Sequence, residues 1–186
     1  MPYEGPKEFT FSKHYEKQNV NTYYKRSHEL DKLNWPFFSD LLKQHTIFLG
    51  VGRGEVLQKS SKWFGADFNR RLLTGWKRLN VLDKVIFGPV ESIHPDFHGD
   101  FDFTASCDFL EHVDPDMVDE VMDQIVMLAP KGKHIIDTNP QSSYRGVDNA
   151  NLHCSANDMQ WWLDKFLEYF PDLEWKRVRN FLWLNW

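Results

Sequence analysis

IFLGVGRGEV, at residues 47–56, is an apolar run that leads into glycines at positions 50, 52 and 54. A short apolar run is typical of a buried strand, and glycines permit a tight turn directly after it. In doubly wound α/β proteins, a turn of this kind binds nucleotide-like cofactors. Because a glycine repeat alone is weak evidence, the prediction depends on further residues at the right distances along the chain.

An acidic residue follows the glycine turn near the spacing of roughly 20 residues that a nucleoside-binding site requires. Asp67 ends the next apolar run, WFGAD. A carboxylate suits this place because it can accept hydrogen bonds from two vicinal ribose hydroxyls. The alternative is that Asp67 only forms a turn or caps the helix that begins at Phe68 and Asn69.

Strands and helices are expected to alternate along most of the chain. Five apolar runs predict strands at 46–51, 62–67, 84–88, 101–106 and 133–138, the last entered through the turn PKG at 130–132. Helical periodicity follows Asn69, then Asp114 and Pro115, and then a capping box formed by Ser155 and Asp158. The pattern predicts a Rossmann-like, doubly wound α/β fold, with a mostly parallel sheet and helices on both faces.

The two ends of the chain lie outside this alternation. Residues 1–45 are expected to form a helical lid segment, with a helix starting at Pro36, and 46–186 the cofactor-binding core of a single domain. Near the C-terminus, the alternation predicts either one long strand or a hairpin about Arg179 and Asn180. The aromatic tail at 181–186 could also pair with another chain, which would give a homodimer.

Composition limits the class of function. The net charge of −5 argues against general nucleic-acid binding, which needs a basic surface. Two cysteines, Cys107 and Cys154, suit a reducing compartment better than a disulfide framework. No apolar run approaches the roughly 18 residues of a membrane span, and the N-terminus is polar. We therefore expect a cytoplasmic protein that does not bind membranes.

Five motifs, in order, resemble those of the class I S-adenosylmethionine-dependent methyltransferases. FLGVGRGEV resembles their first, glycine-rich motif, WFGADFN their acidic second motif, and FGPVESI at 87–93 takes the place of the third. FDFTASCDFLEHV at 101–113 resembles the fourth, and LAPKGKHIIDTNP at 128–140 the turn and strand after it. The resemblance runs from about 46 to 140, with a weaker match over 155–170. It implies a seven-stranded sheet with an antiparallel last strand and S-adenosylmethionine as the cofactor.

The resemblance also implies which residues hold the cofactor. They are Gly50, Val51, Gly52, Gly54, Asp67, Phe68, Val90, Glu91 and Cys107. Two positions depart from the family pattern. Phe48 stands where the family usually has an acid, and Pro89 stands where it has an acid that contacts adenine, although Glu91 lies two residues further on.

The polar residues at the end of the fourth predicted strand are the candidates for catalysis. Methyl transfer is an in-line displacement, for which the protein aligns donor and acceptor and often supplies a base. His112 could be that base, with Asp108 beside it, or it could be a structural histidine. Asp108, Glu111, His112 and a later histidine such as His153 also resemble the ligands of metal-dependent methyltransferases. Metal-free relatives share this short pattern, so a divalent metal is not favoured.

The favoured function is S-adenosylmethionine-dependent methyl transfer to a hydroxyl or amine of a small polar acceptor, with sugars and nucleotides among the options. The polar loop at 139–153 is expected to contact this small-molecule substrate. Two alternatives stay open. One is an enzyme that consumes S-adenosylmethionine without methylating anything, because a fold does not determine its chemistry. The other is a non-catalytic protein of this fold that binds a partner.

Overall fold

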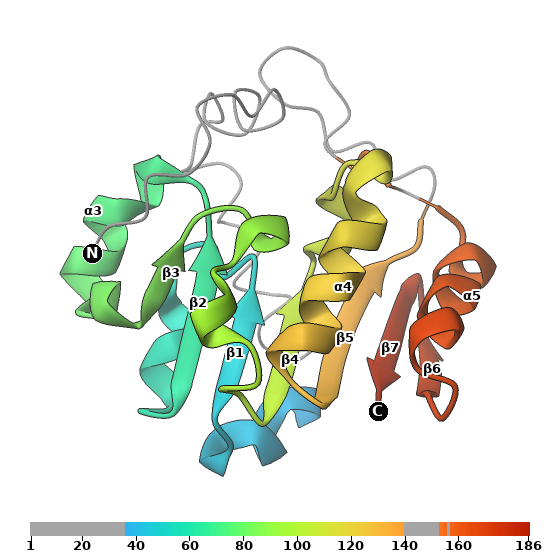
Figure 1. The fold of residues 1–186 in the computed structure, drawn as a ribbon, viewed down its shortest axis with the longest axis horizontal. Coiled ribbons are helices and arrows are strands. Elements are labelled where there is room, and N and C mark those ends of the chain that lie inside the picture. The colour runs from blue at the N-terminus through green and yellow to red at the C-terminus, as the bar shows by residue number, and fades with distance from the viewer. Residues whose placement is uncertain (1–35, 140–152, 156) are drawn as a thin grey trace.

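The described residues form one sheet with helices on both of its faces (Figure 1). The structure is a computed structural model that describes residues 36–139, 153–155 and 157–186. Residues 1–35 of the predicted lid segment at 1–45, and most of the polar loop at 139–153, therefore lie outside the described residues. Through η1 (Ser39–Lys43), the described part of the N-terminal segment is tied to the sheet, where Lys133 Nζ pairs with Asp40 Oδ2 at 2.7 Å.

The sheet has seven strands in the order β3-β2-β1-β4-β5-β7-β6. The strands are β1 (Thr46–Leu49), β2 (Trp63–Asp67), β3 (Val85–Phe87), β4 (Phe103–Cys107), β5 (Lys131–Asp137), β6 (Glu174–Val178) and β7 (Phe181–Asn185). The first five are parallel, and β7 is antiparallel to both of its neighbours. The strand order reverses between β1 and β4, and in open α/β sheets ligands bind at the carboxyl ends of strands beside such a point. The predicted fold class is confirmed.

Helices cover the two faces of the sheet, and each face has its own cluster of buried apolar side chains. The longer elements are α3 (Leu73–Leu79), α4 (Val118–Leu128) and α5 (Met159–Tyr169). The short 3-10 turns are η2 (Glu55–Lys59), η3 (Arg70–Leu72), η4 (Leu82–Lys84), η5 (Val90–Ser92), η6 (Pro95–Phe97), η7 (Leu110–His112) and η8 (Pro115–Met117). Residues of α4 and α5 belong to one cluster, and residues of α3 to the other. Strand β1 joins both, because Ile47 and Leu49 face one cluster and Phe48 the other.

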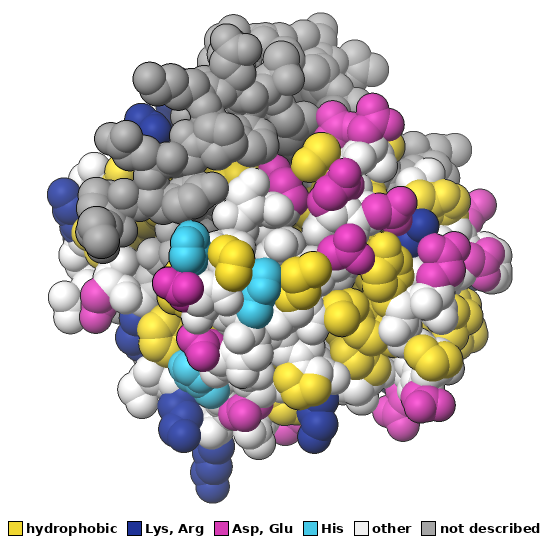
Figure 2. Space-filling view, in the orientation of Figure 1, with side chains coloured by type: hydrophobic (Ala, Val, Ile, Leu, Met, Phe, Trp, Pro, Cys, Tyr) yellow, Lys and Arg dark blue, Asp and Glu magenta, His cyan; other side chains and the backbone are white. Residues whose placement is uncertain are grey.

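The sequence periodicity of α4 matches its position on the sheet. Val121, Met122 and Ile125 are buried against the sheet, as expected for an amphipathic helix. The outward face carries Asp119 and Asp123, and Figure 2 shows acidic side chains gathered over this helix. The exposed face of α4 is therefore acidic.

Side chains cap the helices largely where the sequence predicts. The carboxylate of Asp114 accepts the N–H of Asp116, and that of Asp158 accepts the N–H of Trp161. The predicted capping box is wrong in one respect, because Ser155 Oγ instead donates to the carbonyl of Val113 at 2.7 Å. The predicted turn at 130–132 is also too long, since β5 already begins at Lys131.

The C-terminal residues form a hairpin rather than one long strand. Strands β6 and β7 are joined at Arg179, whose φ of +58° turns the chain. Strand β7 lies between β5 and β6, and its Leu182 and Leu184 are fully buried. Edge pairing of β7 with another chain is therefore excluded, because both edges of this strand are already paired, while the homodimer itself stays a prediction. The outer strand at this end of the sheet is β6.

A buried histidine of β5 is hydrogen-bonded to side chains of β4. His134 is fully buried and forms hydrogen bonds to Ser106 Oγ at 2.7 Å and Thr104 Oγ1 at 3.1 Å. Its ring stacks on Trp186 with an interplanar angle of 6°. Burial lowers the pKa of His134 to about 3, because the interior disfavours the charged imidazolium.

The buried His134 predicts a specific loss of stability in acid. Its pKa is about 3 in the folded protein, against an ordinary histidine value of 6.5, so below pH 6.5 the unfolded chain binds the extra proton. The free energy of unfolding should therefore decrease as the pH is lowered from 6.5 to 3. This residue should contribute up to ~1.4 kcal/mol per pH unit to that decrease. His134→Gln should remove this contribution. Urea denaturation from pH 4 to 7 measures it, with His94→Gln at an exposed histidine as the control. Equal slopes for wild type and His134→Gln would contradict the prediction.

Candidate active site

The first half of the candidate site is the glycine turn after β1. The N–H groups of Gly50 and Val51 both donate to the carbonyl of Ala66, at 2.9 and 3.2 Å. The next N–H along the turn, that of Gly52, donates to Asp67 Oδ2 at 2.8 Å. The glycine turn is therefore held against the carboxyl end of β2, so that the first and second motifs form one unit.

Asp67 is the polar centre of this unit. Its side chain is buried, and its second oxygen, Oδ1, accepts the N–H of Asn69 at 2.9 Å. Burial raises the pKa of Asp67 to about 6, against the opposing effect of the backbone N–H groups. The carboxyl is consequently mostly ionised at pH 7. The structure thus shows the turn-forming role that the sequence left open, in a position that also suits a ribose contact.

Phe109 covers part of the glycine turn, which sequence reasoning missed. Gly50 has a φ of +64°, and a Cβ at this position would overlap the ring of Phe109. The Gly50 backbone was expected to approach the cofactor, but on this side it is in contact with Phe109. In the sequence, the signal for this contact is that Phe109 directly follows the fourth predicted strand. The contact itself arises because that strand, β4, lies beside β1 in the sheet.

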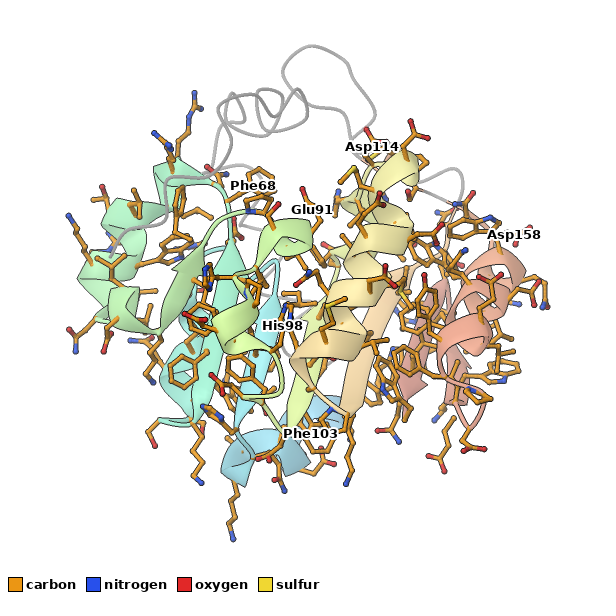
Figure 3. The ribbon with its side chains drawn as sticks, viewed as in Figure 1. Phe68, Glu91, His98, Phe103, Asp114 and Asp158 are labelled. Atoms are coloured by element: carbon orange, nitrogen blue, oxygen red, sulfur yellow. The ribbon has the colours of Figure 1, made fainter. Side chains whose placement is uncertain are left out.

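The other predicted cofactor residues lie along the same edge of the sheet. Figure 3 shows the labelled Phe68 and Glu91 near the carboxyl ends of the strands. Val90 is buried in the α4 cluster, whereas Glu91 is half-buried, and burial raises the pKa of its carboxyl. Cys107 ends β4 and is half-buried.

Phe48, which departs from the family pattern, is part of the core. Its ring centroid lies 4.8 Å from that of Trp63 and 5.6 Å from that of Phe38. A carboxylate among these rings would be buried at a large cost in free energy unless it were paired. The packing of Phe38, from the segment before β1, against Phe48 therefore explains why the side chain at this position is apolar.

The second half of the candidate site follows β4. Asp108 has a φ of +57° and turns the chain out of the strand, while its N–H donates to the carbonyl of Ile135. The ring of His112, in η7, meets the ring of His153 edge to face at a centroid distance of 4.5 Å. One possible ligand atom each from Asp108, His112 and His153 lies within 4.8 Å of the others.

His153 reaches this cluster because the chain around it is bound to η7. The N–H of Ser155 donates to the carbonyl of Glu111 at 3.1 Å. Cys154 Sγ donates to the carbonyl of His112 at 3.0 Å. Burial lowers the pKa of His153, and the neighbouring His112 lowers it further. Both features favour a neutral imidazole, the form that accepts protons and binds metals.

Glu111 does not join the other three predicted ligands. It is fully buried, and its Oε1 accepts the N–H of Asp137 at 2.9 Å. Burial raises the pKa of Glu111 well above its usual range, and the carboxyl of Asp108 adds to the effect. Among the described residues, its Oε2 has no hydrogen-bond partner. The side chain thus connects η7 to the end of β5, behind the cluster.

Comparison with known proteins identifies the fold. No protein-family model and no curated protein sequence matches the chain. Solved structures match at low identity, among them 1,6-didemethyltoxoflavin-N1-methyltransferase of Burkholderia thailandensis, bound to 1,6-didemethyltoxoflavin and S-adenosylhomocysteine. It is 17% identical with a TM-score of 0.62, over 99% of this chain and 92% of that one.

Two further structures agree. A candidate O-methyltransferase of Nostoc punctiforme is 17% identical with a TM-score of 0.61, but the match, over 85% of this chain, spans only 56% of that protein. The methyltransferase domain of a bacterial Hen1 protein is 13% identical with a TM-score of 0.57, over 90% of this chain and 98% of that domain. The chain therefore has the fold of the class I S-adenosylmethionine-dependent methyltransferases, as its five motifs predict. No helix in the described ranges is long and apolar enough to cross a membrane.

The contact between Gly50 and Phe109 predicts the effect of adding one methyl group. Gly50→Ala should lower the free energy of unfolding by about 1–2 kcal/mol through its left-handed backbone alone, and by more through overlap with Phe109. Adding Phe109→Ala to the Gly50→Ala variant should restore only the part of the lost free energy of unfolding that is due to overlap. The control is Gly75→Ala in α3, where the added Cβ meets no atom within 4 Å, and which should stabilise by about 0.5–1 kcal/mol. Urea denaturation distinguishes these cases, and a fully stable Gly50→Ala protein would contradict the described turn.

Proposed function

We propose that this protein is a methyltransferase that uses S-adenosylmethionine to methylate a hydroxyl or amine of a small polar molecule. The observation that carries the proposal is the arrangement at the β1–β4 switch point. The glycine turn and Asp67 lie at the carboxyl ends of β1 and β2, and Asp108 and His112 follow the neighbouring β4. In this fold, such an edge binds cofactor and substrate side by side. The match to a methyltransferase bound to S-adenosylhomocysteine supports the same cofactor.

The residues of the first half fit the ribose of this cofactor. Asp67 Oδ2 accepts the N–H of Gly52 and Oδ1 that of Asn69, and the N–H of Phe68 also contributes, so the roughly four acceptor positions of the carboxylate are only partly used and a ligand hydroxyl can still bind. Because the Gly52 N–H and the Asn69 N–H hold the carboxylate in place, it would bind vicinal hydroxyls without reorganising. Phe68, Val90 and Glu91 are the proposed neighbours of the nucleoside.

The residues of the second half fit the acceptor. His112 is the proposed base, which would remove a proton from the acceptor hydroxyl or amine as the methyl group is transferred. Asp108 lies close enough to His112 to orient the ring or to stabilise its protonated form. The protein would otherwise act by holding the sulfonium carbon and the acceptor in line. A sugar or nucleotide carries hydroxyl groups of the required kind.

The cluster geometry also favours a metal-assisted form of this function as a second candidate. Asp108, His112 and His153 supply one carboxylate and two imidazoles, converging at distances that suit one divalent ion. Two imidazoles suit manganese or zinc better than magnesium, which prefers oxygen ligands. Such an ion would lower the pKa of an acceptor hydroxyl. In this form the two histidines bind the metal and His112 is not the base.

Binding and product analysis separate the proposal from its alternatives. A non-catalytic protein of this fold would bind neither S-adenosylmethionine nor S-adenosylhomocysteine in calorimetry, or would bind them without turnover. An enzyme that consumes the cofactor in another way would yield products without a methylated acceptor. Methylated product together with S-adenosylhomocysteine is the outcome that we expect.

Asp67 provides the test of cofactor binding. Asp67→Ala should weaken binding of S-adenosylhomocysteine by roughly 1–3 kcal/mol, because it removes hydrogen bonds to a charged group. The exposed Asp83→Ala is the control for loss of one carboxylate. Calorimetry gives the affinities, at a temperature where circular dichroism shows each variant to be folded. An unchanged affinity in Asp67→Ala would remove Asp67 from the proposed site.

His112 and His153 provide the test of catalysis. If His112 is the base, His112→Ala should slow turnover by roughly 100-fold or more, with little change in cofactor affinity, and excess chelator should leave the wild type active. If an ion is bound, chelator should abolish activity, manganese should restore it, and His153→Ala should weaken manganese binding in calorimetry. Full activity of His112→Ala would exclude His112 both as the base and as a metal ligand. Full activity of the wild type in excess chelator would exclude the metal.

A further inference from the structure

A buried tryptophan outside the predicted site is bonded to the glycine turn. Trp76 lies in α3 and is fully buried. Its indole N–H donates to the carbonyl of Gly52 at 2.8 Å. None of the sequence motifs includes Trp76, which lies far along the chain from this turn.

The two polar groups of Gly52 are held by two different side chains. Its N–H donates to Asp67 Oδ2 at 2.8 Å, and its carbonyl accepts the indole N–H of Trp76. Gly52 has a φ of +55°, a left-handed conformation that glycine adopts without strain. Asp67 and Trp76 therefore determine where the centre of the turn lies relative to β2 and α3.

Trp76 also packs against the end of the turn. A Cβ at Gly54 would lie 2.9 Å from Trp76 Cδ1, so the glycine backbone rests directly on the indole ring. The other neighbour of Gly54 there is Val81, whose N–H donates to the carbonyl of Trp76. One side chain thus both bonds and supports the turn.

We infer that Trp76 is a positioning residue for the cofactor, acting through the Gly52 carbonyl on the turn and on Asp67. This inference rests on the proposed function. Without the indole N–H, the Gly52 carbonyl loses its donor and the turn can move away from α3. The Gly52 N–H would then no longer hold Asp67 Oδ2 in place, and the carboxylate would have to be ordered when the ribose binds. Cofactor affinity should fall for that reason.

Trp63 is a matched control for a purely structural role. It is fully buried in the same apolar cluster, and its indole N–H also donates to a backbone carbonyl at 2.8 Å. That carbonyl belongs to Leu41 in η1, and Trp63 begins β2, at the edge opposite the glycine turn. Trp76→Phe and Trp63→Phe therefore make the same chemical change in the same cluster, at two different places.

The experiment compares S-adenosylhomocysteine binding and melting temperature for wild type, Trp76→Phe and Trp63→Phe. We expect both variants to melt earlier, with affinity reduced about tenfold in Trp76→Phe and nearly unchanged in Trp63→Phe. Equal affinities for wild type and Trp76→Phe would overturn the inference, as would equal losses in the two variants. Absence of binding by the wild type would instead overturn the proposed function, and this inference with it.

A measurement on the wild type keeps the test valid if Trp76→Phe does not fold. Coupling is reciprocal, so a cofactor that needs the indole–Gly52 bond must also strengthen it. In nuclear magnetic resonance spectra, hydrogen exchange of the Trp76 indole N–H should slow on addition of S-adenosylhomocysteine, while that of Trp63 stays the same. An unchanged exchange rate at Trp76 in the presence of bound ligand would overturn the inference.

Discussion

The hydrogen bond from the Gly52 N–H to the Asp67 carboxylate is the interaction on which the candidate site depends. It joins the turn after β1 to the end of β2, 15 residues further along the chain, so that the first and second motifs form one unit. The bond is made by a buried carboxylate whose pKa is raised to about 6. Ionisation of Asp67 at neutral pH therefore costs free energy in the folded protein, and the bonds from Gly52 and Asn69 offset part of that cost. A ligand with two hydroxyl groups would offset more of it.

Burial has the same effect on the polar groups beyond β4. Glu111 and His153 both have a pKa shifted toward the neutral form, because charge is disfavoured where solvent is excluded. The site thus combines a carboxylate that can stay ionised, at Asp67, with groups that favour neutrality near His112. In the proposed function, the first half would bind hydroxyl groups and the second half would handle a proton or an ion. His134 shows the same shift without such a role, because its partners are Ser106 and Thr104 within the sheet.

The predictions from sequence succeeded where local pattern and chemistry agree. The apolar runs located the parallel strands, and Asn69, Asp114 and Asp158 cap the helices that follow them. Errors arose where a side chain found a distant partner. Ser155 has the composition and spacing of a cap, but it binds the Val113 carbonyl instead. The aromatic tail has the composition of an exposed edge strand, but β7 is enclosed by β5 and β6. Local propensity contains no information about either partner.

The sequence alone was enough to place the five parallel strands along the chain, with the turns after them, and the glycine and acid positions of the candidate site. Glycine at a positive φ and acids at strand ends are local requirements, so they are visible in the chain alone. The folded structure was needed to show that Phe109 covers Gly50, that Trp76 holds Gly52 and that His153 joins His112. It also kept Glu111 out of the cluster of Asp108, His112 and His153, because its Oε1 accepts the backbone N–H of Asp137. These contacts join residues on different strands and helices, and they form only when the sheet order brings those elements together.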